Sequence, residues 1–182
     1  MRKEVFMAGT GGQGVLLIGN LLTYAADEDG LQVSSFPVYS PEVRGGSTTA
    51  TIVISDGAVG SPICGSPAVV LVMDQTSADA NLARLKSGGL LLYNSSLVNS
   101  VGRDDVQRIG ICATDKAIEI GDERVTNMVM LGAYVGLTDA VSLAALENAL
   151  RKVLPERHHK FLPLNMQALE AGAELAKAAK SA

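Results

Sequence analysis

The sequence predicts an α/β fold, in which a doubly wound, mostly parallel β-sheet is followed by a helical C-terminal tail. Three observations lead to this prediction. Short apolar or β-branched runs alternate with segments of helical periodicity over residues 1–140, a pattern typical of a sheet with helices on both faces. A glycine-rich turn lies between the first strand and the first helix. Residues 141–182 contain mainly strong helix formers.

In the first half of the chain, strands and helices follow from hydrophobic spacing. The first strand lies within residues 3–8, and the helix after its glycine turn ends before Gly30. Residues 31–36 form a second strand, and residues 48–55, which are rich in β-branched side chains, form a third. Asp56-Gly57 is expected to turn this third strand into residues 58–64, which gives a hairpin or a strand pair.

The second half continues the alternation and then becomes helical. Buried strands are predicted at 69–73 and 90–94, with a helix at 74–86 between them, and a further strand at 107–113. Thr114 is expected to be the N-cap of the next helix, and residues 127–137 form a buried helix. Ser142 caps a helix and Pro163 opens the last one. We expect a single domain over residues 1–182, with the sheet core in 1–140 and the helical tail in 141–182.

Composition excludes several classes of function. The net charge is −4 with 15 Lys and Arg residues, and aromatic residues make up 4% with no Trp, so the chain lacks both the charge and the stacking surface for nucleic acid. The most apolar stretch, residues 125–137, is shorter than the ~20 residues of a membrane helix. The apolar run at the start breaks into glycines, unlike an export signal. We therefore expect a cytoplasmic protein with no membrane contact.

The cysteines and histidines do not predict a metal site. Cys64 and Cys112 lie in apolar surroundings and are expected to be buried structural thiols. Two cysteines cannot supply the four thiolates of an iron-sulfur cluster. The two histidines, His158 and His159, are adjacent in a charged run, which is unlike a zinc site.

The glycine turn is the first candidate site. Its pattern is G-x-G-x-x-G in a Rossmann-like position, where backbone N–H groups and the following helix N-terminus favour a phosphate or carboxylate. Ser34 and Ser35 stand where NAD binding needs an acidic residue, and no Walker lysine follows the turn. Alternatively, the glycines serve only to pack helix against strand. The candidate contact residues are Gly9, Thr10, Gly11, Gly12, Gln13 and Gly14.

A second loop follows the second predicted strand. It combines a phenol, a carboxylate, a guanidinium and two glycines, and ligands gather at the carboxyl ends of strands in such sheets. The alternative is a solvated carboxylate–guanidinium pair of little energetic value. The candidate residues here are Tyr39, Glu42, Arg44, Gly45 and Gly46.

Two isolated positions are also candidates. Ser61, before Pro62, is either a turn residue or a contact residue. Asn127 is either an N-cap or a hydrogen-bonded amide at an interface.

Taken together, these motifs carry a family resemblance. GTGGQGV at 9–15, P-x-YSPE-x-RGG at 37–46, Ser61-Pro62 and TNM-x-MLGA at 126–133 resemble the gamma subunits of 2-oxoacid:ferredoxin oxidoreductases. The likeness covers nearly the whole chain. Within the family, the sequence resembles the enzymes for 2-oxoglutarate and for branched-chain 2-oxoacids that have separate small subunits, and it does not distinguish between these two.

The resemblance implies a role within a larger enzyme. That enzyme decarboxylates a 2-oxoacid with thiamine diphosphate and Mg²⁺, passes electrons through iron-sulfur clusters to ferredoxin, and leaves an acyl-CoA. This chain would bind no cofactor alone, would pack beside alpha, beta and in some cases delta subunits, and would close the active site with its two loops, in contact with coenzyme A.

Two other interpretations stay open at the level of sequence. A free-standing NADP-binding Rossmann protein would use Arg44 for the 2′-phosphate, although the short helical tail offers no substrate domain. A scaffold would use its glycines for packing alone.

Overall fold

The computed structural model describes residues 1–39, 46–61 and 64–181, which contain six strands and six α-helices. The strands are β1 (Arg2–Thr10), β2 (Gln32–Tyr39), β3 (Ser47–Ser55), β4 (Val69–Val72), β5 (Leu90–Asn94) and β6 (Gln107–Ile111). The helices are α1 (Val15–Glu28), α2 (Gln75–Asn81), α3 (Ala113–Ile120), α4 (Thr126–Thr138), α5 (Leu143–Val153) and α6 (Leu162–Ser181). Short 3₁₀ turns lie at Leu82–Arg84, Glu123–Val125 and Glu156–Phe161.

The strands form one sheet in the order β2-β3-β1-β4-β5-β6. β1, β4, β5 and β6 are parallel neighbours, whereas β3 runs antiparallel to both β1 and β2. Because β3 alone is reversed, the carboxyl ends of the other strands meet at one edge of the sheet. The prediction of a mostly parallel α/β sheet is confirmed.

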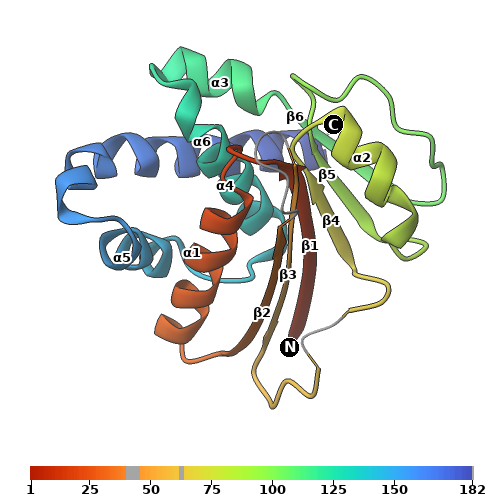
Figure 1. The fold of residues 1–182 in the computed structure, drawn as a ribbon, viewed down its shortest axis with the longest axis horizontal. Coiled ribbons are helices and arrows are strands. Elements are labelled where there is room, and N and C mark those ends of the chain that lie inside the picture. The colour runs from red at the N-terminus through yellow and green to blue at the C-terminus, as the bar shows by residue number, and fades with distance from the viewer. Residues whose placement is uncertain (40–45, 62–63, 182) are drawn as a thin grey trace.

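Helices cover the two faces of the sheet unequally (Figure 1). On one face, Val5 and Met7 of β1 and Ile52 of β3 pack in a large core with side chains of α1, α4, α5 and α6. On the other face, Phe6 and Ala8 of β1 join a smaller cluster under α2. The alternation of these β1 residues between two cores is the period of two that a sheet buried on both sides requires.

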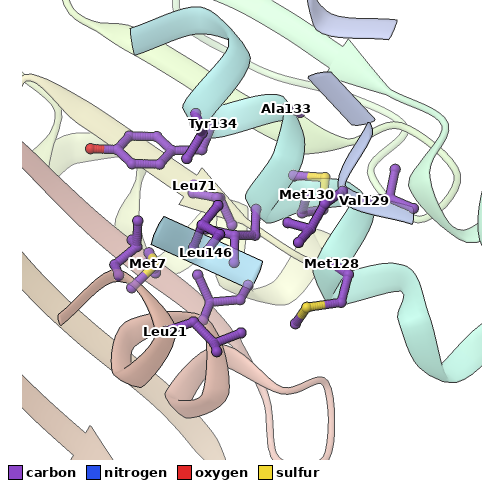
Figure 2. Close-up of a cluster of buried hydrophobic side chains, with 14 of the residues drawn as sticks. Met7, Leu21, Leu71, Met128, Val129, Met130, Ala133, Tyr134 and Leu146 are labelled. Carbon is purple, nitrogen blue, oxygen red and sulfur yellow. The ribbon is translucent and has the colours of Figure 1, made fainter. Parts of the chain in front are cut away.

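The last helices belong to the larger core. Figure 2 shows Met128 and Tyr134 of α4 beside Met7 and Leu146, which come from β1 and α5. α4 and α6 approach so closely that a side chain at Gly132 or Gly172 would overlap the backbone of the other helix. The glycines of the predicted buried helix therefore allow contact between two backbones. Within the described residues, no helix combines the length and the apolar character needed to cross a bilayer.

Three local predictions are wrong. β3 pairs with β1 and β2, so Asp56-Gly57 does not start a hairpin: both edges of β3 are already occupied. The N-cap of α3 is Cys112 rather than Thr114, whose hydroxyl instead accepts a hydrogen bond from the carboxamide of Asn94 at 2.9 Å. Cys112 is exposed rather than buried, because it stands at a helix start on the surface.

Candidate functional site

A cleft of about 240 Å³ opens at the edge of the sheet where the parallel strands end. It lies between the glycine turn, the ends of β4 and β5, and the first turns of α3 and α4. Its lining combines apolar side chains with neutral polar ones, and adds one carboxylate and one guanidinium. The lining residues are Gly12, Gln13, Met73, Asn94, Leu97, Thr114, Glu123, Arg124, Thr126 and Asn127.

The glycine turn has a backbone conformation that its sequence explains. Gly12 and Gly14 have φ values of +98° and +79°, a region that costs other residues about 1–2 kcal/mol. Gly14 is the N-cap of α1, and no side chain caps this helix or places an acid in its first turn. The positive end of the helix dipole is thus left at the cleft, where an anion would be stabilised.

The described ends of the second predicted loop lie on the side of the sheet where the glycine turn is found. The backbone N–H of Gly11 donates to the carbonyl oxygen of Gly46 at 2.9 Å. Gly46 directly precedes β3, and Thr48 of β3 pairs with Tyr39 at the end of β2. The carboxyl end of β2 therefore lies on the same side as the glycine turn.

Asp74 ties the glycine turn to the next strand. One carboxylate oxygen accepts from both the N–H and the hydroxyl of Thr10, at 3.0 and 2.9 Å, and the other accepts from the N–H of Ser77 at 2.8 Å. Burial alone would raise the pKa of Asp74, but these hydrogen bonds outweigh burial and lower the pKa. Gln13 adds a second restraint, since its side-chain oxygen also accepts from the Thr10 N–H, at 2.8 Å.

Asn127 lies directly against the start of α1. The residue is 6% exposed, in the first turn of α4, and a Cβ at Gly14 would overlap its side-chain nitrogen and lie 2.9 Å from its Cγ. Two motifs far apart in sequence are thereby in contact. The carboxamide lines the cleft beside the N-terminus of α1, where it can donate to an anionic ligand.

Asn94 forms the floor of the cleft. It is fully buried at the end of β5, and its nitrogen donates to the Met73 carbonyl oxygen at 3.3 Å and to the Thr114 hydroxyl at 2.9 Å. Its oxygen accepts from the N–H of Ala113 at 3.2 Å. One amide thus links β4, β5 and α3, which fixes the spacing of the cleft walls.

The charged side chains of the cleft stand at its rim. Arg124 is 76% exposed and forms an ion pair with Asp122 at 2.6 Å, which holds the pKa of Asp122 at about 2. The guanidinium carbon also lies 5.5 Å from the centre of the Phe161 ring. Both contacts orient Arg124 between the cleft and Phe161, the last residue of the 3₁₀ turn that precedes α6.

Comparison with known proteins identifies the family. The family model described as pyruvate ferredoxin/flavodoxin oxidoreductase matches residues 4–175. The chain belongs to this oxidoreductase family.

Relatives within the oxidoreductase family differ in length. The 2-oxoglutarate synthase subunit KorC of Methanothermobacter marburgensis is 38% identical over 184 residues, covering 96% of this chain and 97% of KorC. The ketoisovalerate oxidoreductase subunit VorA of the same organism is 34% identical over 175 residues, covering 96% of this chain but only 36% of VorA. This chain therefore spans about a third of the length of VorA.

A solved structure has the same fold. The keto/oxoacid ferredoxin oxidoreductase gamma subunit from Geobacter sulfurreducens superimposes with a TM-score of 0.84 at 36% identity, covering 97% of this chain and 99% of that chain. This chain therefore shares its α/β architecture with that gamma subunit over nearly its whole length.

The structure brings together some of the predicted site residues. Gly9–Gly14, Gly46 and Asn127 gather at the cleft edge. Ser61 does not line the cleft. It lies in the connection from the carboxyl end of β3 to the amino end of β4, and both of these ends are on the side of the sheet opposite to the cleft. Glu42, Arg44 and Gly45, together with the side chain of Tyr39, lie outside the described residues.

Asp74, Asn94 and Arg124 were missed by sequence reasoning. A signal existed for the first two, because Asp74 and Asn94 each stand at the end of a continuous apolar strand, VVLVM or LLLY, where a ligand edge is expected. Arg124 gave no such signal, since it is an exposed residue in a short connection.

The cysteines are separate from the cleft. Cys64 donates to the carboxylate of Glu4 at 2.9 Å, and burial together with this contact raises the pKa of Cys64 to about 11. Among the described residues, no group of three or more His, Cys, Asp or Glu side chains could hold a metal ion.

Proposed function

We propose that this chain is the gamma subunit of a multi-subunit 2-oxoacid:ferredoxin oxidoreductase, which oxidises a 2-oxoacid to an acyl-CoA and passes the electrons to ferredoxin. The observation that carries the proposal is the match to KorC, which covers 97% of that subunit. The family favours this function over a free-standing NADP-binding protein, because relatives such as KorC and VorA carry names of 2-oxoacid enzymes.

Division of labour within the complex follows from the side chains present. Two cysteines cannot supply the four thiolates of a cluster, so the iron-sulfur clusters are assigned to other subunits of the complex. The family resemblance assigns thiamine diphosphate and Mg²⁺ to the alpha, beta or delta subunits as well. Ferredoxin would then meet the complex through those subunits, in the cytoplasm.

The contribution of this chain is proposed to lie at the cleft, with coenzyme A as the ligand. Three features support binding of one of its phosphates there: the uncapped N-terminus of α1, the carboxamide of Asn127 and the guanidinium of Arg124. The predicted contacts of Tyr39, Glu42, Arg44 and Gly45 would complete the site from the second loop.

The subunit assignment is tested by purifying the tagged chain from its own cells without oxygen. We expect thiamine- and cluster-containing subunits to copurify, with reduction of a viologen dye that requires both a 2-oxoacid and coenzyme A. A chain that copurifies with none of these subunits and carries bound NADP would refute the assignment.

The coenzyme A contact is tested with Asn127→Asp in the assembled enzyme. The change preserves side-chain size but places a negative charge where a phosphate would bind, so the KM for coenzyme A should rise at least tenfold while the KM for the 2-oxoacid stays constant. Asn20→Asp is the control, because it makes the same change in charge at an exposed position of α1 that does not line this cleft. Arg44→Ala should act in the same direction as Asn127→Asp. Unchanged coenzyme A kinetics in both site variants would refute the contact.

A further inference from the structure

Two large apolar side chains stand exposed next to each other on β2. Phe36 is 45% and Val38 is 48% exposed. Because they are two residues apart on a strand, they lie on the same face of the sheet. Among the described residues, the other large exposed apolar side chains are on other parts of the chain: Met1, Tyr24, Leu97, Ile118 and Leu143. Phe36 and Val38 therefore form an apolar pair on the surface.

This pair continues a core row of the sheet. Phe36 pairs with Thr51 of β3, which pairs with Phe6 of β1, which pairs with Val70 of β4. Phe6 and Val70 are 5% and 0% exposed, in the cluster that α2 covers. α2 packs on β1 and β4, so β3 separates it from β2. The row is thus buried under α2 at one end and uncovered at Phe36.

The chemistry of β2 favours contact through side chains over addition of another strand. β2 is the edge strand of the sheet, and an edge pairs readily with a second copy unless it is blunted. Pro37, between Phe36 and Val38, has no N–H to donate and is a residue that blunts such edges. A second copy paired edge to edge is therefore disfavoured, whereas a partner that covers the apolar side chains is not.

The greater length of VorA indicates the kind of partner that would cover Phe36 and Val38. In VorA, the region that matches this chain is joined to further sequence that makes up about two-thirds of its length. In KorC, the region that matches this chain makes up 97% of the subunit. A surface that serves to hold the additional region inside one chain in VorA would have to be an interface between separate chains in the shorter form.

We propose that Phe36 and Val38 anchor this chain to a separate subunit that is homologous to the part of VorA outside the match. This inference rests on the proposed function, since it names the partner within the same complex. The position fits the role: the carboxyl end of β2 lies beside the glycine turn, through the pairing of Tyr39 with Thr48 and the bond from Gly11 to Gly46.

The test compares two double variants of the tagged chain, coexpressed with the other subunits of its complex. Phe36→Lys with Val38→Lys places two charges in the proposed interface, and buried apolar anchors dominate binding energy in such interfaces. Tyr24→Lys with Ile118→Lys makes the same change in charge at two exposed positions on α1 and α3. Both double variants should have the same thermal unfolding midpoint as wild type, because all four side chains are exposed. The measurement is the affinity for the VorA-homologous subunit, identified by its mass.

The outcomes separate the interface from the function. We expect the Phe36/Val38 variant to lose affinity at least tenfold and the Tyr24/Ile118 variant to bind as wild type. If wild type assembles and both variants bind equally well, this interface is wrong while the subunit function stands. If wild-type chain binds no such subunit, the proposed function fails as well. A homodimer of the isolated chain that the Phe36/Val38 variant abolishes would assign the surface to a second copy and overturn the proposal.

Discussion

The contact between Gly14 and Asn127 makes a strong prediction about the site. Replacing Gly14 with Ala forces a Cβ onto a residue with φ of +79°, which costs about 1–2 kcal/mol in backbone strain. The same Cβ overlaps the side-chain nitrogen of Asn127 and lies 2.9 Å from its Cγ, and overpacking of this kind costs about 1–3 kcal/mol more. The free energy of unfolding should fall by about 2–5 kcal/mol in total.

A double-mutant cycle separates the two contributions. In an Asn127→Ala background only Cβ of residue 127 remains, at 3.2 Å from the added methyl, so Gly14→Ala should cost about 1–2 kcal/mol of strain alone. Gly12→Ala is the matched control, with φ of +98° and no heavy atom within 4 Å of the added Cβ. Free energies come from urea unfolding of all the variants. An equal cost of Gly14→Ala in both backgrounds would show that Asn127 does not restrict this position.

Three further predictions concern the core and the support of the cleft. Gly172→Ala should lower the free energy of unfolding by about 3 kcal/mol or more, because the added Cβ would overlap the Val129 carbonyl oxygen, and a backbone atom cannot rotate away. Thermal unfolding measures this loss, with Gly57→Ala as the control because a Cβ at Gly57 enters open space. Tyr134→Phe should change the free energy of unfolding by less than about 1 kcal/mol, in the stabilising direction if at all, since the buried Tyr134 hydroxyl has no hydrogen-bond partner within the described residues. A decrease of more than about 1 kcal/mol in urea unfolding would contradict this prediction. Because the pKa of Asp74 is lowered in the folded protein, its contribution to the free energy of unfolding is present above the unfolded pKa and is lost as pH falls through the folded pKa. The difference in this free energy between wild type and Asp74→Asn should therefore be constant above about pH 5 and shrink below it. A difference that grows on acidification would refute the assignment.

The sequence predicted those strands, turns and helices whose structure depends only on a few consecutive residues. The strand, glycine turn and helix at 2–28 could be placed because positive φ and an apolar period are properties of a few consecutive residues. The position of β3 in the sheet could not be predicted, because its insertion between β1 and β2 depends on pairing with strands on both sides. A β-branched composition predicts a strand but does not indicate which strands pair with it. The same reason explains the false hairpin at Asp56-Gly57: a turn signal does not show which edges are free.

For the site, sequence reasoning found the residues with special backbone needs and missed those that act through hydrogen bonds. Gly14 and Asn127 were both candidates, but their contact crosses from α1 to α4 and is a property of the packed helices. Asn94 holds β4, β5 and α3 together through one carboxamide, and an asparagine at a strand end has many other uses. Only the three-dimensional arrangement gives it the role of positioning the cleft walls.

The chemistry of the cleft explains why the chain would work only within a complex. At about 240 Å³ it is smaller than the roughly 300–1,000 Å³ of typical ligand pockets. Its ionisable lining residues, Glu123 and Arg124, are both exposed at the rim, so neither has the desolvated setting that tunes a general acid or base. What the cleft offers is helix N-terminal N–H groups and neutral amides, which bind and orient an anion but transfer no proton.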